Sequence, residues 1–137
     1  DPMPVDAPPV YKAECGSCHL AFPPGFLVAD DWKRVMAKLD KHYGDNASLD
    51  EPLRRQIEDY LVNNAGSARR LGDAPGDPPR FTDSRGFQRR HHEVPASLWQ
   101  DKRVGSAANC GACHTRAEQG SFREREIRLP GGRRWED

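Results

Sequence analysis

Two five-residue motifs carry the clearest chemistry in this sequence. Residues 15–19 read CGSCH and residues 110–114 read CGACH. Two thiols separated by two residues can lie on one helical turn and add across the two vinyl groups of one haem, and the next residue can then direct its imidazole at the iron. We therefore expect two covalently attached haem c groups. The predicted attachment residues are Cys15, Cys18, Cys110 and Cys113, and the predicted proximal iron ligands are His19 and His114.

Other uses of paired cysteines fit this sequence less well. The pairs of a zinc ribbon lie about 15–20 residues apart, whereas 91 residues separate Cys18 from Cys110. A zinc site would also leave both following histidines unexplained. A thioredoxin-like motif needs buried strands in a βαβ unit, and the chain has no Val/Ile-rich run. Disulfides within each pair would be strained and would close very small loops.

The second iron ligand of the first haem is expected on a predicted helix. Apolar residues at helical spacing indicate an amphipathic helix that begins at an N-cap, Asp30 or Asp31, and ends near Gly44. Its apolar residues are Trp32, Val35, Met36 and Leu39. His42 falls on the flank of this buried face, so we predict it as the distal ligand, with a hydrogen-bonded core histidine as the alternative. Met36 lies near the centre of the face and is expected in the core.

The second haem has two adjacent candidates for its distal ligand, His91 and His92. His91 lies one helical turn after Phe87, which is apolar, while His92 lies one turn after Gln88. We therefore choose His91 and keep His92 as the alternative. A short helix capped by Ser106 or Asn109 is expected to carry the second motif.

The remaining pattern indicates a mainly α fold with extensive loops. A capping box at Ser48 and Glu51 precedes a second amphipathic helix that stops at Gly66. Residues 67–80 are rich in Pro and Gly, without periodicity, and are expected to connect an N-terminal haem domain, residues 1–66, to a C-terminal one, residues 81–137. Only 36% of the residues are hydrophobic and 31% are charged. The protein core should therefore be small, with the haems completing it.

Charge and hydropathy exclude two classes of function. The net charge is zero, which argues against nucleic-acid binding, and no run approaches the roughly 20 apolar residues of a membrane span. The charge is uneven: residues 1–66 hold 7 basic and 11 acidic groups, and residues 67–137 hold 14 basic and 10 acidic groups. The chain begins at Asp1 without Met or a leader pattern, so we expect a removed signal peptide or a trimmed sequence.

The order of these motifs resembles a known family. The string DDWKRVMAKLDKHYGDNASLDEPLRRQIEDYLVNNA, with CGSCHLAFPP before it and FQRRHHEVP and ANCGACHTRAEQGSF after it, is similar to the small soluble dihaem cytochromes c of purple and related proteobacteria. The resemblance runs from about Tyr11 to Leu129. It implies two small haem-binding helical domains, the N-terminal one resembling a class I cytochrome c. It also implies a periplasmic electron carrier with two low-potential, bis-histidine haems.

The resemblance further implies partners and distal ligands. The expected electron acceptor is a small monohaem, oxygen-binding cytochrome c of the sphaeroides haem protein type, and the expected donor is a membrane cytochrome b or another quinol-linked protein. His42 and a histidine of the RRHHEV segment would be the distal ligands, and the doubled His91–His92 leaves the second of them open. We expect a monomer that is not an enzyme and neither binds nucleic acid nor inserts into a membrane.

The number of ligands on each iron distinguishes an electron carrier from a haem enzyme or gas sensor. An iron with six nitrogen ligands has no open position, so it can only take and pass electrons. In the alternative, a haem enzyme or gas sensor, one iron would keep an open position for a diatomic gas or peroxide. The sequence favours the electron carrier because it offers three histidines for two distal positions.

Overall fold

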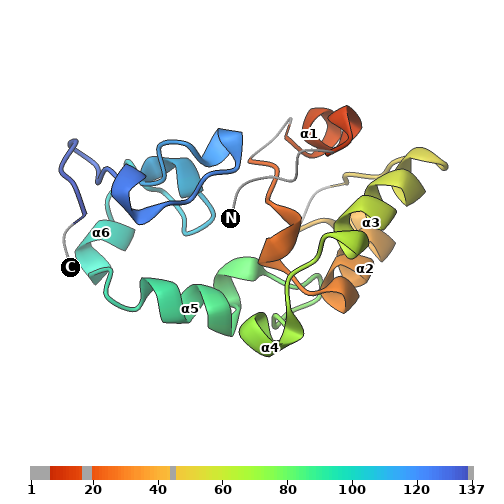
Figure 1. Cartoon of the computed structure of the whole chain (residues 1–137), viewed down its shortest axis with the longest axis horizontal. Helices are drawn as coiled ribbons and strands as arrows, with labels where there is room; N and C mark the ends of the chain where they lie inside the picture. The colour runs from red at the N-terminus through yellow and green to blue at the C-terminus, as the bar shows by residue number, and fades with distance from the viewer. Residues whose placement is uncertain (1–6, 17–19, 44–45, 136–137) are drawn as a thin grey trace.

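The computed structural model describes residues 7–16, 20–43 and 46–135. Its described part contains six α-helices, several 3₁₀ turns and no β-strand, as expected for a mainly α fold. The helices are α1 (Pro9–Cys15), α2 (Ala29–Ala37), α3 (Leu53–Asn63), α4 (Ala68–Leu71), α5 (Arg85–His91) and α6 (Ala96–Trp99). In Figure 1, α1, α2 and α3 gather on the right, and α5, α6 and the C-terminal segments lie on the left.

The main hydrophobic core lies among α1, α2 and α3. It joins one apolar face of each helix, because the buried side chains recur at helical spacing. Its largest members are Tyr11, Trp32, Val35, Met36, Ile57, Tyr60 and Leu61. Met36 is only 3% exposed, which confirms the prediction that it belongs to the core. The side chain of Ile57 is completely buried between its neighbours.

The loop after the first CxxCH motif is fixed to this core by three hydrogen bonds. The Tyr11 hydroxyl donates to the carbonyl of Phe22, and the Trp32 indole donates to the carbonyl of Pro24 at 2.8 Å. The Gly66 N–H donates to the carbonyl of Leu27 at 2.8 Å. A Cβ at Gly66 would lie 2.4 Å from the carbonyl oxygen of Gly25, so only glycine allows this close approach of the two backbones.

The predicted bounds of the helix before His42 are wrong at both ends. The N-cap is Val28 rather than Asp30 or Asp31, and α2 ends at Ala37, seven residues before Gly44. Asp31 does not cap because its carboxylate is turned inward, where it accepts the N–H of Ala74 at 2.7 Å. After α2 the chain tightens into a 3₁₀ turn, Leu39–Lys41, and His42 follows it with extended backbone angles.

The predicted caps of the next helix also differ from the structure. No capping box forms, because Ser48 bonds to the side chain of Asn46 and the carboxylate of Glu51 pairs with Arg54. The N-cap of α3 is Pro52. The helix ends at Asn63, where the Asn64 side chain donates to the carbonyl of Tyr60 at 2.9 Å, so Gly66 is not its stop.

The segment that was expected to be a connection, residues 67–80, packs against the N-terminal helices. It contains α4, and its residues Leu71, Ala74 and Pro79 are buried. Its backbone is held by the Asp31 carboxylate, which is itself 1% exposed and also accepts from Arg34 at 3.4 Å. Where the chain divides into domains stays a prediction.

This buried carboxylate gives a test of the packing. Asp31→Ala should lower the free energy of unfolding by about 2–3 kcal/mol, because it leaves the Ala74 N–H buried without an acceptor. Asp31→Asn should cost less, since the amide oxygen can still accept. Urea unfolding of the haem-loaded protein, followed by far-UV circular dichroism, measures both. Asp30→Ala is the matched control: Asp30 is exposed, and we expect a change within about 0.5 kcal/mol. Equal losses for Asp30→Ala and Asp31→Ala would contradict this account.

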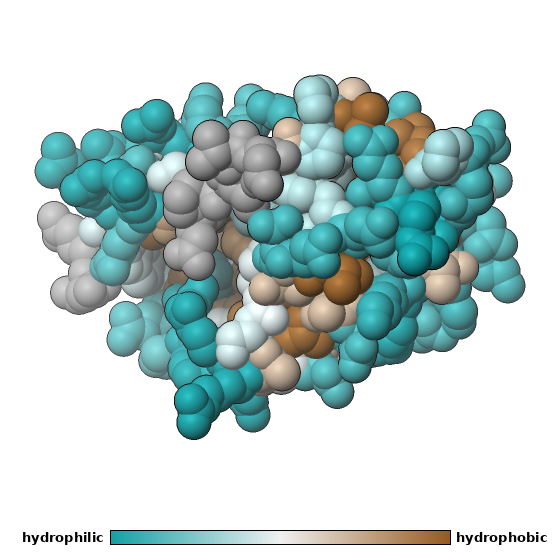
Figure 2. Space-filling view, turned by 45° about the vertical axis from the view of Figure 1, so that its right-hand side comes forward, coloured by the Kyte–Doolittle hydropathy of each residue, from teal (hydrophilic) through white to brown (hydrophobic). Residues whose placement is uncertain are grey.

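The C-terminal half is built from short helices and turns. Ser84 caps α5 by accepting the N–H of Phe87 at 3.2 Å, and α6 follows directly after Pro95. The face seen in Figure 2 is mostly hydrophilic, with hydrophobic side chains only in limited patches, as the composition leads one to expect. Within the described residues, no helix has the length and apolar character needed to cross a membrane.

Candidate functional site

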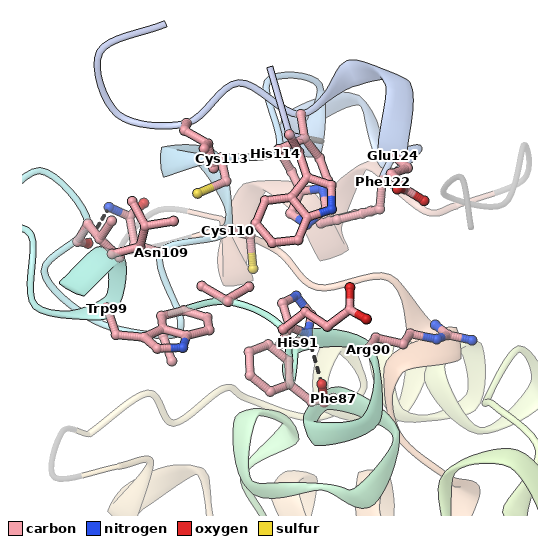
Figure 3. Close-up of a pocket in the computed structure, with 18 of the residues that line it drawn as sticks. Phe87, Arg90, His91, Trp99, Asn109, Cys110, Cys113, His114, Phe122 and Glu124 are labelled. Carbon is pink, nitrogen blue, oxygen red and sulfur yellow. Dashed lines mark hydrogen bonds between the residues drawn. The ribbon is translucent and has the colours of Figure 1, made fainter. Parts of the chain in front are cut away.

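The second motif folds as one tight turn that places its three reactive side chains together. Cys110–Ala112 form a 3₁₀ turn, and the His114 N–H closes a helical turn on the carbonyl of Cys110 at 2.8 Å. Side chains at positions i, i+3 and i+4 then share one face. Accordingly, Cys110, Cys113 and His114 all line one cavity, as Figure 3 shows.

Two backbone contacts hold this turn in place. His114 bridges to Ile127, and the Arg128 N–H donates to the carbonyl of Cys113 at 2.9 Å. The expected caps are absent, because no side chain caps the turn at Asn109 and the Asn109 side chain instead donates to the carbonyl of Val104 at 2.8 Å. The turn is therefore positioned by tertiary contacts rather than by a helix of its own.

His91 approaches the same cavity from the opposite side. Its ring lies 6.3 Å from the ring of His114, centre to centre, at an interplanar angle of 75°, and Figure 3 shows the two on facing walls. The ring stacks on Phe87 at 3.9 Å, and its Nδ1 donates to the carbonyl of Phe87 at 2.8 Å. This bond fixes the ring and its tautomer, leaving Nε2 as the nitrogen that can ligate a metal.

His92 is placed less favourably than its neighbour. It also borders the cavity, but its side chain is 68% exposed. Its Nδ1 donates to the carbonyl of Arg89 at 2.7 Å, and its Nε2 lies 3.8 Å from the carboxylate of Glu93. The ring that faces His114 is thus that of His91.

The cavity between the two histidines has the size and lining of a cofactor site. Its volume is about 600 Å³, within the roughly 300–1,000 Å³ of ligand pockets. Its walls are mainly aromatic and aliphatic side chains from α5, α6 and the C-terminal segment. They include Phe87, Leu98, Trp99, Val104, Phe122, Ile127, Leu129 and Trp135. Such walls suit a flat, largely apolar ring system.

The histidines themselves fit a metal-centred group. A metal–nitrogen bond to imidazole is about 2 Å long, and each ring centre lies behind its nitrogen. A separation of 6.3 Å between ring centres therefore leaves room for one metal ion. The Nδ1 of His114 is buried and forms no hydrogen bond within the described residues. The residues of this cavity therefore fit a haem.

Burial also sets the charge state of these groups. It lowers the pKa of both His91 and His114 below the usual value of histidine, so the imidazoles are neutral at neutral pH, the form that ligates a metal. Burial raises the pKa of the Cys110 thiol to about 11 and raises that of Cys113 as well. Before haem is attached, these thiols are therefore protonated at neutral pH rather than present as reactive thiolates.

The first motif is only partly described. Cys18 and His19 lie outside the described residues, and Cys15 is the last residue of α1, half-buried. Burial raises the pKa of Cys15 to about 11. His42, the predicted distal ligand, is also half-buried, and its Nδ1 is fully enclosed. Whether it faces His19 stays a prediction.

The neighbour of His42 fixes its surroundings. The Tyr43 ring packs edge-on against the His42 ring at 4.5 Å, and its hydroxyl donates to the carbonyl of Pro79. The Arg80 guanidinium lies 5.0 Å from the centre of the Tyr43 ring. Tyr43 adopts a φ of +53°, which a bulky residue rarely does. The packed segment 67–80 thus supports the backbone next to the predicted ligand.

One feature of the site was not predicted from the sequence. The chain has five phenylalanines, and all of them form one aromatic cluster that reaches both histidines of the second cavity. Phe26 stacks on Phe81 at 4.4 Å and meets Phe122 at 4.9 Å. Phe122 in turn lies 5.1 Å from His114. The members of the cluster are Phe22, Phe26, Phe81, Phe87 and Phe122.

This cluster joins distant parts of the chain. Phe22 and Phe26 follow the first motif closely, whereas Phe87 stacks on His91 and Phe122 lies beside His114. The segment after one motif is therefore packed against the walls of the other motif's cavity. No spacing rule in the sequence could reveal it, because its members come from four separate segments.

Comparison with known proteins shows the family of this chain. A model of the dihaem cytochrome c family matches residues 11–122. Among solved structures, the diheme cytochrome c of Shewanella baltica OS155 is 41% identical, with a TM-score of 0.79, over 92% of this chain and 95% of that one. A search of curated proteins finds no match.

Two structures of the diheme cytochrome c of Rhodobacter sphaeroides are also similar. One is 42% identical, with a TM-score of 0.71, over 87% of this chain and all of the other. The second is 40% identical, with a TM-score of 0.75, over 89% of this chain and all of the other. The chain therefore belongs to the dihaem cytochrome c family, and its cofactors are two haem c groups.

Proposed function

We propose that this protein is a periplasmic electron carrier in which both haem irons are ligated by two histidines. The observation that supports it most directly is the pair of imidazoles, His91 and His114, that face one another across the cavity at 6.3 Å. When bound, each haem takes up and releases one electron. The proposed ligand pairs are His19 with His42 for the first haem and His114 with His91 for the second.

The chain's own residues suit this task. The hydrogen bond from His91 Nδ1 to the carbonyl of Phe87 and the stacking of the two rings hold the imidazole in one orientation. A ligand fixed in this way need not move between oxidation states, so electron exchange requires little reorganisation. Histidine also stabilises the oxidised iron more than methionine does, so both potentials should lie below those of His/Met cytochromes.

Full ligation predicts slow reaction with carbon monoxide. The reduced protein at neutral pH should show no immediate shift of its Soret band after mixing with carbon monoxide, because neither iron has an open position. Stopped-flow absorbance spectroscopy measures this directly. An immediate, stoichiometric shift would reject the carrier and favour the alternative, an enzyme or gas sensor with one open iron.

For its partners, we propose a small monohaem, oxygen-binding cytochrome c of the sphaeroides haem protein type as acceptor. A membrane cytochrome b or another quinol-linked protein would be the donor, and the protein would act as a monomer. The proposal is supported by membership of the dihaem cytochrome c family. The net charges of −4 in residues 1–66 and +4 in residues 67–137 suit a transient, electrostatically steered encounter.

Steering of this kind depends on salt. Electron transfer to the monohaem cytochrome should be fast at low salt and should slow markedly as the Debye length falls from about 30 Å at 0.01 M to about 10 Å at 0.1 M. Stopped-flow oxidation of the reduced protein across a salt series measures this rate. A rate that stays flat or rises with salt would point instead to apolar docking around an exposed haem edge.

A further inference from the structure

Five exposed arginines gather on two neighbouring helices, and no acidic side chain in the described part of the chain pairs with them. The helices α4 and α5 contain no acidic residue. The arginine face consists of Arg69, Arg70, Arg85, Arg89 and Arg90. Some basic residues elsewhere in the described chain form ion pairs, as Arg54 does with Glu51 and Glu58. The five guanidinium groups of the arginine face therefore stand on two helices without a carboxylate of their own.

The fold holds these charges together. Gly86 of α5 packs on Leu71 of α4 so closely that a Cβ at Gly86 would lie 2.7 Å from the Leu71 side chain. The Arg89 guanidinium donates to the carbonyl of Arg70 at 3.1 Å. Figure 1 shows the two helices next to one another along the lower edge of the molecule. The packing of α5 on α4 thus holds the two backbone segments that carry the five arginines next to one another.

The arginine face adjoins the second haem cavity. Arg70 and Arg90 line a groove of about 280 Å³ together with Phe26, Asn64 and Ser67. Arg90 also lines the larger cavity, and Figure 3 shows it beside His91 with its guanidinium directed away from the two facing rings. An acidic side chain seated between Arg70 and Arg90 would therefore lie against the wall of the second cavity.

We propose that the arginine face is the docking surface for the acidic surface of a partner redox protein, and that electrons cross between the two proteins through the second haem. This proposal rests on the proposed function. The groove between Arg70 and Arg90 receives carboxylates of the partner, and the other three arginines attract the partner at longer range. One electron passes at each encounter, so one iron is oxidised as the partner's metal is reduced, and no bond is made or broken.

A protein fits this face better than an anionic membrane does. The large apolar side chains of the two helices, Leu71 and Phe87, are buried, so the helices have no apolar face left to insert into lipid. The groove is also recessed, which suits a protruding carboxylate side chain rather than a flat layer of headgroups. Arginine, moreover, pairs with carboxylates through two parallel hydrogen bonds, which gives a protein contact its orientation.

The test compares two double variants of the haem-loaded protein that lose the same charge. Arg70→Gln/Arg90→Gln removes the two arginines of the groove. Arg133→Gln/Arg134→Gln removes two exposed arginines outside α4 and α5 and is the control. The reduced proteins are mixed with oxidised plastocyanin, an acidic copper protein, in a stopped-flow instrument at low and high salt. The small cation hexaammineruthenium(III) serves as a second oxidant that needs no acidic docking.

We expect the groove variant to reduce plastocyanin at least about fivefold more slowly than the parent at low salt, and the difference to vanish at high salt. The control should stay within about twofold of the parent. With hexaammineruthenium(III), the groove variant should be as fast as the parent or faster, which shows that its haems remain reactive. Unchanged visible spectra confirm that both variants are folded.

Three results would overturn the proposal. Equal slowing in both double variants would mean that net charge acts rather than this face. An unchanged rate in the groove variant, with loss of binding to phosphatidylserine vesicles, would assign the arginine face to a membrane. A parent protein that reduces neither oxidant would refute the electron carrier itself, and the docking surface with it.

Discussion

Replacing His91 with Ala should open one haem iron and leave the other closed. The oxidised variant should show one high-spin and one low-spin haem by low-temperature EPR, and the reduced variant should bind about one carbon monoxide per chain. The reason is geometric: His91 is the ring that faces His114 across the second cavity, at 6.3 Å between ring centres. Without it, the described part of the cavity offers no other imidazole in that position.

His92→Ala is the matched control, because it removes the same side chain from the adjacent residue. His92 is largely exposed and bonds to the carbonyl of Arg89, so its loss should leave both haems low-spin and closed to carbon monoxide. Added imidazole should restore the low-spin spectrum of His91→Ala by entering the space that the side chain leaves. The reverse pattern, with His92→Ala opening the iron, would show that the ligand is His92.

His42→Ala should have an effect of the same size at the first haem. It should produce one high-spin iron and one carbon monoxide site per chain, while the second haem stays low-spin. His42 is half-buried with an enclosed Nδ1, and the contacts of Tyr43 with Pro79 and Arg80 hold the adjacent backbone. Combining His42→Ala with His91→Ala should open both irons, since the two changes act at different haems.

Tyr43→Phe tests whether a change in the surroundings of His42, with His42 itself retained, alters the first haem. The variant keeps the ring that packs on His42 at 4.5 Å and removes only the hydroxyl that bonds to Pro79. We expect a small loss of stability, about 1 kcal/mol, and two low-spin haems. If the oxidised spectrum of His42→Ala matched that of the parent, another residue would be the distal ligand of the first haem.

The proposed electron transfer and the proposed docking surface place different demands on the chain. Ligation needs histidines that are fixed and neutral. Burial favours the neutral form of His91 and His114, and the contacts of His91 with Phe87 fix its ring. Docking needs charges that remain accessible, and the short helices α4 and α5 supply these within the same packed unit. Two consecutive residues illustrate these two demands. Arg90 is exposed and belongs to the proposed docking surface, whereas the His91 ring faces His114 across the cavity.

The sequence alone determined the cofactor chemistry of this protein. Two CxxCH motifs specify two covalent haems because the spacing of their side chains is local and does not depend on the rest of the fold. The choice of His91 over His92 rested on a helical turn from Phe87, and the structure contains that turn in α5, with the two rings stacked. The burial of Met36 in the core likewise followed from helical periodicity.

Tertiary structure decided where the helices begin and end. Asp31 and Ser48 have side chains that could cap a helix, but a carboxylate that satisfies the buried N–H of Ala74 contributes more in the folded protein than one that caps α2. The periodic pattern up to His42 did not reveal that α2 stops at Ala37 and is followed by a 3₁₀ turn. Beyond the end of α2, packing rather than helical register sets the direction in which each side chain points.

Contacts between distant segments could not be inferred from any local pattern. Residues 67–80 have the composition of a linker, yet Leu71, Ala74 and Pro79 are buried, and Ala74 belongs to the core formed by the N-terminal helices. The aromatic cluster and the groove between Arg70 and Arg90 likewise combine residues far apart in the chain. The sequence thus predicted two covalently attached haem groups, because the attachment motif is local. The tertiary structure decided which surfaces surround the haems, because burial depends on every segment that packs there.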